Sequence, residues 1–390
     1  MRAQRDRNPL AGGPARAHGD TLAAMPALAR TVGWGLYCTT SWTWCIGMYL
    51  PLILLRDYGW PGFIAFAVPN VLGCAAFGYV VDRTRSEALR AKLGGAMTAF
   101  AAATILYQCA FLTWRVAGDP AGPPAQMMLL VGIALLFVLL RRGGSADSLW
   151  IGVGVAACAT SAWAALSVGA SRLPEIPWTG TRPSSELACA APVIALGFLA
   201  CPYLDLTFHR ARERSPSRHS FAVFGVTFAM MLMVSAMTFD PSSGDALPVW
   251  PVLVQWTVQA CATIGMHARE MRRGLIAVAA CLLGCGLALW AMPHVFGAGE
   301  REPLAMGGEA NYLRLLGLYG LAFPFWLILR LRGRSPWLAA MAIVACIPFM
   351  EAGFVGHRSA LLLVPPALLA VLCAVPVAHS RRTAEATTAN

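Results

Sequence analysis

Apolar stretches recur along the whole chain and are separated by short polar segments. A helix needs about 20 apolar residues to cross a bilayer. Twelve stretches of roughly that length can be delimited: 31–55, 60–81, 94–114, 125–140, 149–170, 188–208, 219–238, 249–268, 274–293, 312–330, 336–355 and 359–378. The pattern predicts an all-α integral membrane protein with about twelve transmembrane helices.

The composition agrees with this pattern. Of the 390 residues, 57% are hydrophobic and 13% are charged, whereas soluble domains carry about 25% charged residues. The basic excess lies between the apolar stretches and not on one polar surface, so we expect a lipid bilayer and no nucleic acid as partner. The cysteines lie mostly within apolar stretches without CxxC spacing and are expected to be packing residues, with no metal and no cofactor.

Lysine and arginine alternate between the two sides of the predicted membrane. With the N-terminus inside, the inside segments carry 23 of these residues and the outside segments carry 7. Cytoplasmic loops hold the excess of such residues. We therefore expect a multi-pass protein of the cell (inner or plasma) membrane with both termini cytoplasmic. Residues 1–30 are expected to be a disordered cytoplasmic tail, and 379–390 a second cytoplasmic tail.

The first stretch has an unusually polar middle. Hydroxyl residues and indoles follow one another directly, and a glycine comes shortly after: Thr39, Thr40, Ser41, Trp42, Thr43, Trp44 and Gly47. Consecutive residues point all round a helix, whereas a packing interface occupies one face. The cluster favours a binding site or a break in the helix. The alternative is packing through small residues whose hydroxyls bond to their own helix.

The sixth stretch carries a second predicted break. Pro202 lacks a backbone donor and clashes with the preceding turn, and Gly197 permits non-helical angles. Asp205, which follows Tyr203, would then lie in the first turn of a second half-helix, where the exposed amides favour a carboxylate. Two roles stay open for Asp205: a cap or partner of Arg210, or a group that couples a cation or proton.

Polar stripes run along two further stretches. Gln255, Gln259, Thr263 and His267 follow at intervals of four on one helix face, and Thr104, Tyr107 and Gln108 share a face of the third stretch. Asn70 adds a weaker polar position in the second stretch. Each alone is typical of an interhelical hydrogen bond, but together these inward faces are hard to satisfy in a dry bundle.

Four polar residues lie near the predicted outer surface. They are Glu309, Asn311, Arg314 and Glu351. We interpret them as solvated or paired charges.

Stretches one and six start five crossings apart and run in opposite directions, as an inverted five-plus-five repeat requires. Over residues 31–330 the chain resembles the LeuT-like transporters of the amino acid, polyamine and organocation superfamily, including sodium/solute symporters. The resemblance implies repeats at 31–170 and 188–330, two additional helices at 336–378, an unwound first helix at Thr39–Gly47 and a sixth-helix break at Gly197–Pro202.

The expected function is therefore secondary transport, by symport or uniport, of a small polar or zwitterionic solute through alternating access, with no catalytic residues. The candidate substrate- or ion-binding residues are Thr39, Thr40, Ser41, Trp42, Thr43, Gly47, Thr104, Tyr107, Gln108, Gly197, Pro202, Tyr203, Asp205, Gln255, Gln259 and Thr263.

The coupling ion stays open between Na⁺ and H⁺. Sodium-dependent members of the superfamily set adjacent hydroxyl residues in the inner part of the eighth helix, whereas this chain has Thr263 preceded by Ala262. Proton coupling through Asp205 and uncoupled uniport are therefore alternatives.

Two other functions also stay open. A membrane-embedded transferase acting on a lipid-linked substrate would use the charged outer loops at 171–187 and 294–311. A non-transporting sensor or scaffold would make the polar stripes structural. Nothing in the pattern specifies an oligomeric state.

The charge alternation predicts the topology directly. Reporter fusions after Arg214 and after Arg334 should be cytoplasmic, and a fusion after Ser243 should be external. Opposite results at two of the three sites would contradict the predicted spans.

Overall fold

The structure is a computed structural model that describes residues 25–117, 123–142, 146–271, 274–290 and 308–375. The predicted tail at 379–390 lies outside these ranges, as does most of the predicted tail at 1–30. Residues 27–30 already belong to the first helix, so the helix begins four residues earlier than the sequence predicted.

The described chain is almost entirely helical. The first part forms α1 (Ala27–Trp42), α2 (Cys45–Tyr58), α3 (Trp60–Val80), α4 (Arg83–Leu112), η1 (Thr113–Ala117), α5 (Pro123–Arg141), α6 (Asp147–Val168) and η2 (Ala170–Glu175).

The second part begins with α7 (Ser184–Ala200), η3 (Cys201–Leu204), α8 (Leu206–Arg214), α9 (Ser220–Met237), β1 (Phe239–Asp240), β2 (Asp245–Ala246), α10 (Trp250–Glu270) and α11 (Gly274–Trp290). It continues with α12 (Gly308–Gly317), η6 (Leu318–Ala322), α13 (Phe323–Leu331), α14 (Pro336–Met350), η7 (Glu351–Val355), η8 (Ser359–Leu363) and α15 (Val364–Ala374). The strands β1 and β2 pair as a short antiparallel hairpin.

Capping and turn residues set several of these boundaries. The Asp82 side chain accepts a hydrogen bond from the Arg85 amide at the start of α4, and the Ser335 side chain does the same for Leu338 at the start of α14. Such caps satisfy amides that have no partner within the helix. Gly59, with φ of 65°, joins α2 to α3 in a conformation that glycine adopts without strain.

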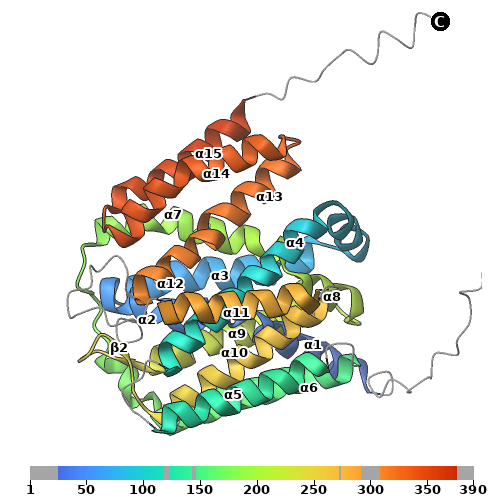
Figure 1. Cartoon of the computed structure of the whole chain (residues 1–390), viewed down its shortest axis with the longest axis vertical. Coiled ribbons are helices and arrows are strands. Elements are labelled where there is room, and N and C mark those ends of the chain that lie inside the picture. The colour runs from blue at the N-terminus through green and yellow to red at the C-terminus, as the bar shows by residue number, and fades with distance from the viewer. Residues whose placement is uncertain (1–24, 118–122, 143–145, 272–273, 291–307, 376–390) are drawn as a thin grey trace, which may run out of the picture.

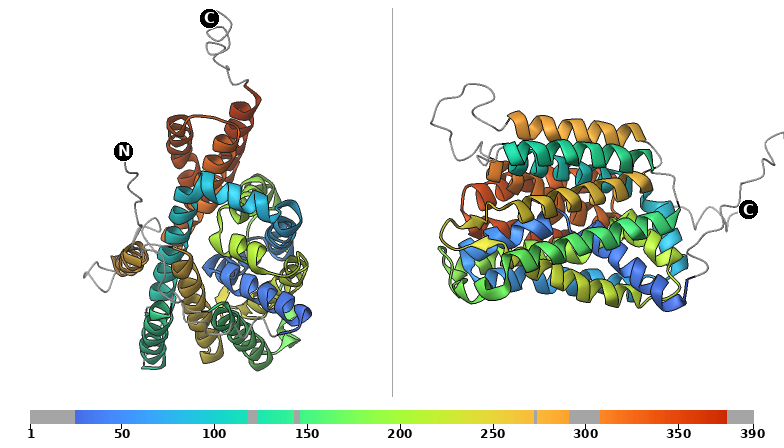
Figure 2. Two further views of the ribbon diagram at one scale, coloured as in Figure 1. Left: turned by 90° about the vertical axis from the view of Figure 1, so that its right-hand side faces the viewer. Right: turned by 90° about the horizontal axis from the view of Figure 1, so that it is seen from below.

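The helices run side by side as a bundle (Figures 1 and 2). The left panel of Figure 2 looks along several of them, and the right panel shows them lying nearly parallel. In Figure 1 α14 and α15 lie at one side of the bundle beyond α7, and α5 and α6 lie at the opposite side. The C-terminal pair is thus peripheral to the helices that surround α1 and α2.

Seven helices of the described residues are long and apolar enough to cross a membrane, or eight if the bent pair α1 and α2 is one crossing. Helices also cover the remaining predicted stretches, with apolar segments at Val131–Arg141, Gly274–Leu287 and Ser359–Ala374. The 21-residue α10 is long enough and falls outside the set because of its polar residues. The all-helical membrane character is thus supported, whereas the count of twelve crossings is not established by these lengths.

Exposure along the bundle is the reverse of that in a soluble protein. Large apolar side chains are strongly exposed, including Leu166 (85%), Leu275 (86%) and Trp337 (78%), whereas Gln108 and Gln259 are completely buried. Exposed apolar surface on this scale marks contact with an apolar partner, and a lipid bilayer provides that partner for the entire bundle.

Ion pairs show which segments lie at the same end of the bundle. At one end Arg90 pairs with Glu213, and Asp147 pairs with Arg210 and Arg269. All of these segments are predicted to be cytoplasmic. At the other end the pairs are Arg56–Glu309, Arg115–Asp245, Arg172–Asp240, Arg182–Asp57 and Arg314–Glu351. Every ion pair between described segments joins two that the charge alternation places on the same side, which supports the predicted alternation.

Close helix packing at Gly197 gives a stability prediction. A β-carbon at this position would lie 2.7 Å from the carbonyl oxygen of Tyr319 in η6, and backbone cannot move aside as a flexible side chain can. Gly197→Ala should destabilise the protein by about 1–3 kcal/mol, as overpacking does, and lower the melting temperature in detergent.

The matched control is Gly152→Ala in α6, where the new methyl group has no neighbour within 4 Å. That change should leave the protein unaffected or stabilise it by up to about 1 kcal/mol, because alanine favours the helix. Equal melting temperatures for the two variants would contradict the tight contact between α7 and η6.

Candidate functional site

The first predicted crossing is broken at its middle. Helix α1 ends at Trp42, helix α2 starts at Cys45, and their axes differ by 62°. The connecting residues are Thr43, with φ of −76° and ψ of 73°, and Trp44, which is extended. The predicted unwinding over Thr39–Gly47 was therefore too long, because Thr39–Trp42 and Gly47 remain helical.

A break in a buried helix leaves backbone carbonyls without intrahelical partners, and α10 supplies donors to them. Gln259 Nε2 donates to the carbonyl oxygens of Thr40 (2.6 Å) and Thr43 (3.0 Å), and Thr263 Oγ1 donates to that of Thr40 (2.9 Å). One turn further along α10, His267 Nε2 lies 3.3 Å from the carbonyl oxygen of Ser41. Three residues of the predicted stripe on α10, Gln259, Thr263 and His267, thus face the break.

Helices α4 and α12 hold the other side of the break. Gln108 Oε1 accepts a hydrogen bond from the Cys45 amide (2.7 Å), and the Tyr312 hydroxyl donates to the Cys45 carbonyl (3.0 Å). The Tyr107 hydroxyl donates in turn to the Tyr312 carbonyl (2.7 Å). Thr104 Oγ1 lies 3.1 Å from the Tyr319 hydroxyl. Together these contacts position the start of α2.

The polar residues before the break point in different directions, as their consecutive positions predicted. Thr40 Oγ1 donates to the Gly154 carbonyl in α6, and Trp42 Nε1 donates to Asn70 Oδ1 in α3. Thr39 Oγ1 donates to the carbonyl of Gly35 in its own helix, and Thr43 Oγ1 donates in the same way to that of Thr39. The hydroxyl groups of Thr39, Thr40 and Thr43 thus donate to helix backbone carbonyls, as the alternative of helix packing predicted.

Three predicted site residues contact other parts of the bundle. Gln255 Nε2 lies 3.5 Å from Ser161 Oγ in α6, away from the break. Gly47 offers its carbonyl oxygen to Ser235 Oγ in α9 (2.9 Å). Tyr203 is half-buried with its ring 5.5 Å from that of Phe77. None of these contacts involves the backbone groups freed at the break.

The sixth stretch departs from a regular α-helix later than predicted. Helix α7 continues through Gly197 to Ala200, and the turn η3 over Cys201–Leu204 contains Pro202. Gly197 serves close packing and not the break. Asp205 is the N-cap of α8, one residue before the predicted first turn, and its Oδ1 accepts from the amide and the hydroxyl of Thr207, both at 2.7 Å.

Asp205 is connected to the break in α1 through Thr207. Thr207 Oγ1 lies 2.8 Å from Ser41 Oγ, and Ser41 is two residues before Thr43. The two interrupted helices, α1 with α2 and α7 with α8, therefore meet at Ser41.

Four fully buried polar atoms beside the break have no hydrogen-bond partner among the described residues. They are Gln108 Nε2, Gln259 Oε1, Asp205 Oδ2 and His267 Nδ1. An unsatisfied buried polar group costs about 1–3 kcal/mol, and such groups are rare in native proteins. Gln108, Gln259 and His267 contact the backbone of residues 40–45, and Asp205 reaches Ser41 through Thr207, so the free atoms of these side chains indicate places for water, an ion or a polar ligand along the break.

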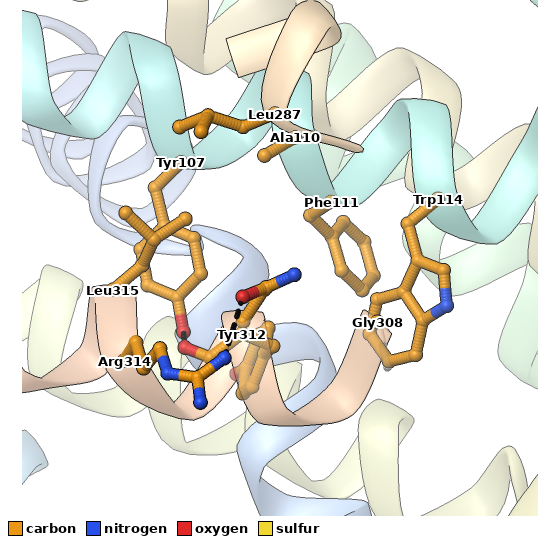
Figure 3. A pocket seen from close by; sticks show the side chains of 10 residues that line it. Tyr107, Ala110, Phe111, Trp114, Leu287, Gly308, Tyr312, Arg314 and Leu315 are labelled. Atoms are coloured by element: carbon orange, nitrogen blue, oxygen red, sulfur yellow. Dashed lines mark hydrogen bonds between the residues drawn. The ribbon is translucent and has the colours of Figure 1, made fainter. Parts of the chain in front are cut away.

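Two cavities are lined by different parts of α4, and Gln108 lies beside Tyr107 at the start of one of them. The one toward Arg314, called the outer cavity, has a volume of about 190 Å³. It is lined by Asn311 and Arg314 and by mainly aromatic and apolar side chains, namely Tyr107, Ala110, Phe111, Trp114, Leu287, Tyr312 and Leu315 (Figure 3). The inner one, of about 770 Å³, is lined by Glu87, Arg90, Ala91, Gly94, Gly95, Thr98, Leu206 and Glu270. From Thr98 to Tyr107 the helix rises by about 14 Å.

An aromatic layer separates the two cavities. The Trp44 ring lies 5.3 Å from Phe100 and 4.8 Å from Tyr319, and Phe100 lies 5.0 Å from Phe323. Phe100 is located on α4 between Thr98 of the inner cavity and Tyr107 of the outer one. Trp44, Phe100 and Tyr319 are buried, so the layer is part of the packed interior between the two sets of lining residues on α4.

The charged groups of the described outer loop at 171–187 are largely engaged. Arg172 pairs with Asp240 at 3.5 Å, and Arg182 pairs with Asp57 and Glu186. The Ser242 and Ser243 hydrogen bonds, together with Arg172, hold the pKa of Asp240 below its ordinary value. The predicted paired charges are confirmed further along the chain, where Arg56 pairs with Glu309 and Arg314 with Glu351. Most of the loop at 294–311 lies outside the described residues.

No protein-family model, no curated protein and no solved structure matches the chain. The site therefore has to be interpreted from its own geometry.

Sequence reasoning left several contributors out of the candidate set. Tyr312 and Tyr319 are seven residues apart on the tenth stretch, a spacing that places both on one helix face, and that face meets α4. Thr207 follows Asp205 by two residues, the spacing of a side-chain-to-amide cap. These local signals could have been recognised, but the helices that the residues contact could not be predicted without the tertiary structure.

The contacts of Gln259 give a stability prediction. Gln259→Leu removes the side-chain donor to the Thr43 carbonyl and leaves that buried oxygen unsatisfied, so it should destabilise the protein by about 1–3 kcal/mol. The measurement is denaturation of the purified protein in detergent.

Gln255→Leu is the matched control, one turn earlier on the same helix and also buried. It removes one long contact to Ser161, whose hydroxyl still donates to the Ala157 carbonyl. Gln255→Leu should therefore lower the free energy of unfolding by less than Gln259→Leu does. Equal losses in the two variants would show that Gln259 does not stabilise the break.

Proposed function

We propose that the chain is a secondary transporter for a small polar or zwitterionic solute that works by alternating access. Under this proposal it crosses the membrane twelve times with both termini cytoplasmic, and residues 31–170 and 188–330 form inverted repeats of the LeuT-like type. One observation carries the proposal: a broken helix bordered by unpartnered buried polar atoms lies between two cavities at opposite ends of the bundle.

Helix packing supports the inverted repeat. An inverted repeat pairs each of the first five predicted crossings with the crossing five positions later, so that α4 corresponds to α10 and α5 corresponds to α11. The contact of α4 with α11 then corresponds to that of α10 with α5. The same pairing also maps the contact of α3 with α7 onto that of α9 with α1 and α2, and the contact of α4 with α8 onto that of α10 with α1. Contacts of α3 with α9 and of α4 with α10 map onto themselves. These pairs follow the exchange that is expected of two repeats related by an axis in the membrane plane, whereas the contact of α2 with α3 has no counterpart of similar extent between α9 and α7 or α8.

The position of the break supports a solute site. Discontinuous helices in such transporters place backbone groups at mid-membrane, where they bind polar substrate groups. Here the Gln108 and Gln259 side chains each use one end of the amide on the backbone at the break and keep the other end free. A free amide hydrogen and a free carbonyl oxygen suit a solute that carries both an acceptor and a donor.

The two cavities support alternating access. Each lies on a different side of the aromatic layer, so the described conformation resembles a closed state between outward and inward opening. Thr43, Thr104 and Gln259 are almost completely buried in it. Opening to one side would require that the layer around Trp44 and Phe100 separate from η6 or α13.

Selective blockage of the outer cavity tests the function. In a variant without native cysteines, Leu315→Cys should react with a membrane-impermeant thiol reagent added outside intact cells, and a bulky adduct there should reduce uptake of the transported solute to background. Uptake is measured with a panel of radiolabelled amino acids and other zwitterions.

Ser243→Cys is the matched control, because Ser243 is exposed in the outer hairpin and lines neither cavity. Its labelling should leave uptake unchanged. Absence of protein-dependent uptake for every solute of the panel, or equal inhibition at both positions, would contradict the proposed function.

A further inference from the structure

Asp205 and His267 are two buried titratable groups that converge on one residue of the broken helix. Both side chains are completely buried. Asp205 reaches Ser41 Oγ through the hydroxyl of Thr207, and His267 reaches the Ser41 carbonyl directly at 3.3 Å. The two groups therefore approach the break from α8 and from α10.

The hydrogen bonds assign the protonation of the neutral His267 ring. A backbone carbonyl oxygen only accepts hydrogen bonds, so the ring nitrogen beside it, Nε2, carries the hydrogen. Nδ1 then holds a lone pair, and it has no partner among the described residues. Asp205 has a corresponding free atom, because Oδ1 accepts from Thr207 twice whereas Oδ2 accepts from no described group.

A proton suits this site better than a metal cation does. An ionised carboxylate buried without a counter-charge is costly, and protonation removes that cost. Hard cations require several oxygen ligands, whereas Asp205 Oδ2 is the one carboxylate oxygen of this pair of residues that accepts no hydrogen bond from a described group. Among the described residues, no group of three or more His, Cys, Asp or Glu side chains could hold a metal ion.

The inner cavity gives the site a route to water. Its lining includes Leu206, which directly follows Asp205, and Glu270, which is one turn after His267 on α10. A proton that leaves the pair on this side therefore has a short path to the cavity.

Building on the transport function proposed above, we propose that Asp205 and His267 form an exchangeable proton site and that the coupling ion is H⁺. In the loaded state Asp205 Oδ2 carries the proton and the ring is neutral. Neither Asp205 Oδ2 nor His267 Nδ1 has a hydrogen-bond partner among the described residues, so the two are not in direct contact, and the transfer passes through a water molecule between them. This water gives a proton to His267 Nδ1 and takes up the proton of Asp205 Oδ2, which leaves a carboxylate and an imidazolium. The imidazolium then gives this proton to water in the inner cavity, and the ring returns to its neutral form.

The surroundings contain other titratable or charged groups that a titration has to separate. Cys38 on α1, Cys74 on α3, Cys201 in η3 and Tyr319 in η6 lie within electrostatic range of Asp205. Nearer the cytoplasmic end lie Arg90 on α4, Asp147 on α6, Arg210 and Glu213 on α8, and Arg269 and Glu270 on α10. The measurement must therefore detect a carboxyl group specifically, and single substitutions must show which residue carries that group.

Infrared difference spectroscopy of the full chain in lipid provides this readout, through the C=O stretching band of a protonated carboxyl group. Between about pH 5 and pH 8, the range in which histidine titrates, the wild type should show a band that disappears as the pH rises. Asp205→Asn should remove it. Asp57→Asn is the matched control and should keep it, because Asp57 is also buried but pairs with Arg56 and Arg182.

His267→Gln provides a second measurement if Asp205→Asn does not fold. Glutamine removes the base but can still donate a hydrogen bond to the Ser41 carbonyl. Without an imidazolium to stabilise the carboxylate, the Asp205 band should persist to higher pH. A wild-type spectrum without a band that depends on Asp205 or His267 would overturn the proposal.

Sodium is tested in the same preparation. If sodium chloride raises the melting temperature relative to choline chloride in the wild type but not in Asp205→Asn, Asp205 binds Na⁺ and the proposal is wrong. The titration requires no transported solute, so its failure is distinguishable from failure of the uptake experiment. Once a transported solute is identified, Asp205→Asn should abolish uptake of that solute against its concentration gradient but should retain exchange of the solute across the membrane.

Discussion

The structure depends on the cost of interrupting a helix inside an apolar bundle. Between Trp42 and Cys45 the backbone loses the hydrogen bonds that a continuous helix would supply, and no water is available in hydrocarbon to replace them. Side chains from α4, α10 and α12 supply partners for the Thr40, Thr43 and Cys45 backbone groups. The polar faces of these helices are therefore required by the break itself.

The same contacts connect the break to the rest of the bundle. Gln108 and Gln259 hold the two ends of the interruption from opposite helices, and each keeps one polar atom free. A ligand that satisfied these atoms would strengthen the closed arrangement, because it would bridge α4 and α10 across the break. Under the proposed function the same side chains would combine structural support with ligand binding, and the aromatic layer around Trp44 lies between the residues that line the two cavities.

Much of the arrangement could be predicted from the sequence because helix periodicity and lipid exposure act locally. The stripe on α10 and the break near Thr43 follow from spacing and composition, and the ion pairs named above join segments that the charge alternation places on the same side. The extent of each break could not be predicted. Gly197 stays helical because it packs against the Tyr319 backbone, and Gln255 turns toward Ser161. Both outcomes depend on neighbours distant in the sequence.

An experimental structure of the protein in a lipid nanodisc, at a resolution that shows bound water, tests the central claim most directly. We expect α1 and α2 to be separated at Thr43 and Trp44, with non-protein density within hydrogen-bonding distance of Gln108 Nε2 and Gln259 Oε1. A continuous helix from Ala27 to Tyr58, or a dry break at which these two atoms bond to other protein groups, would contradict a ligand site at the interruption.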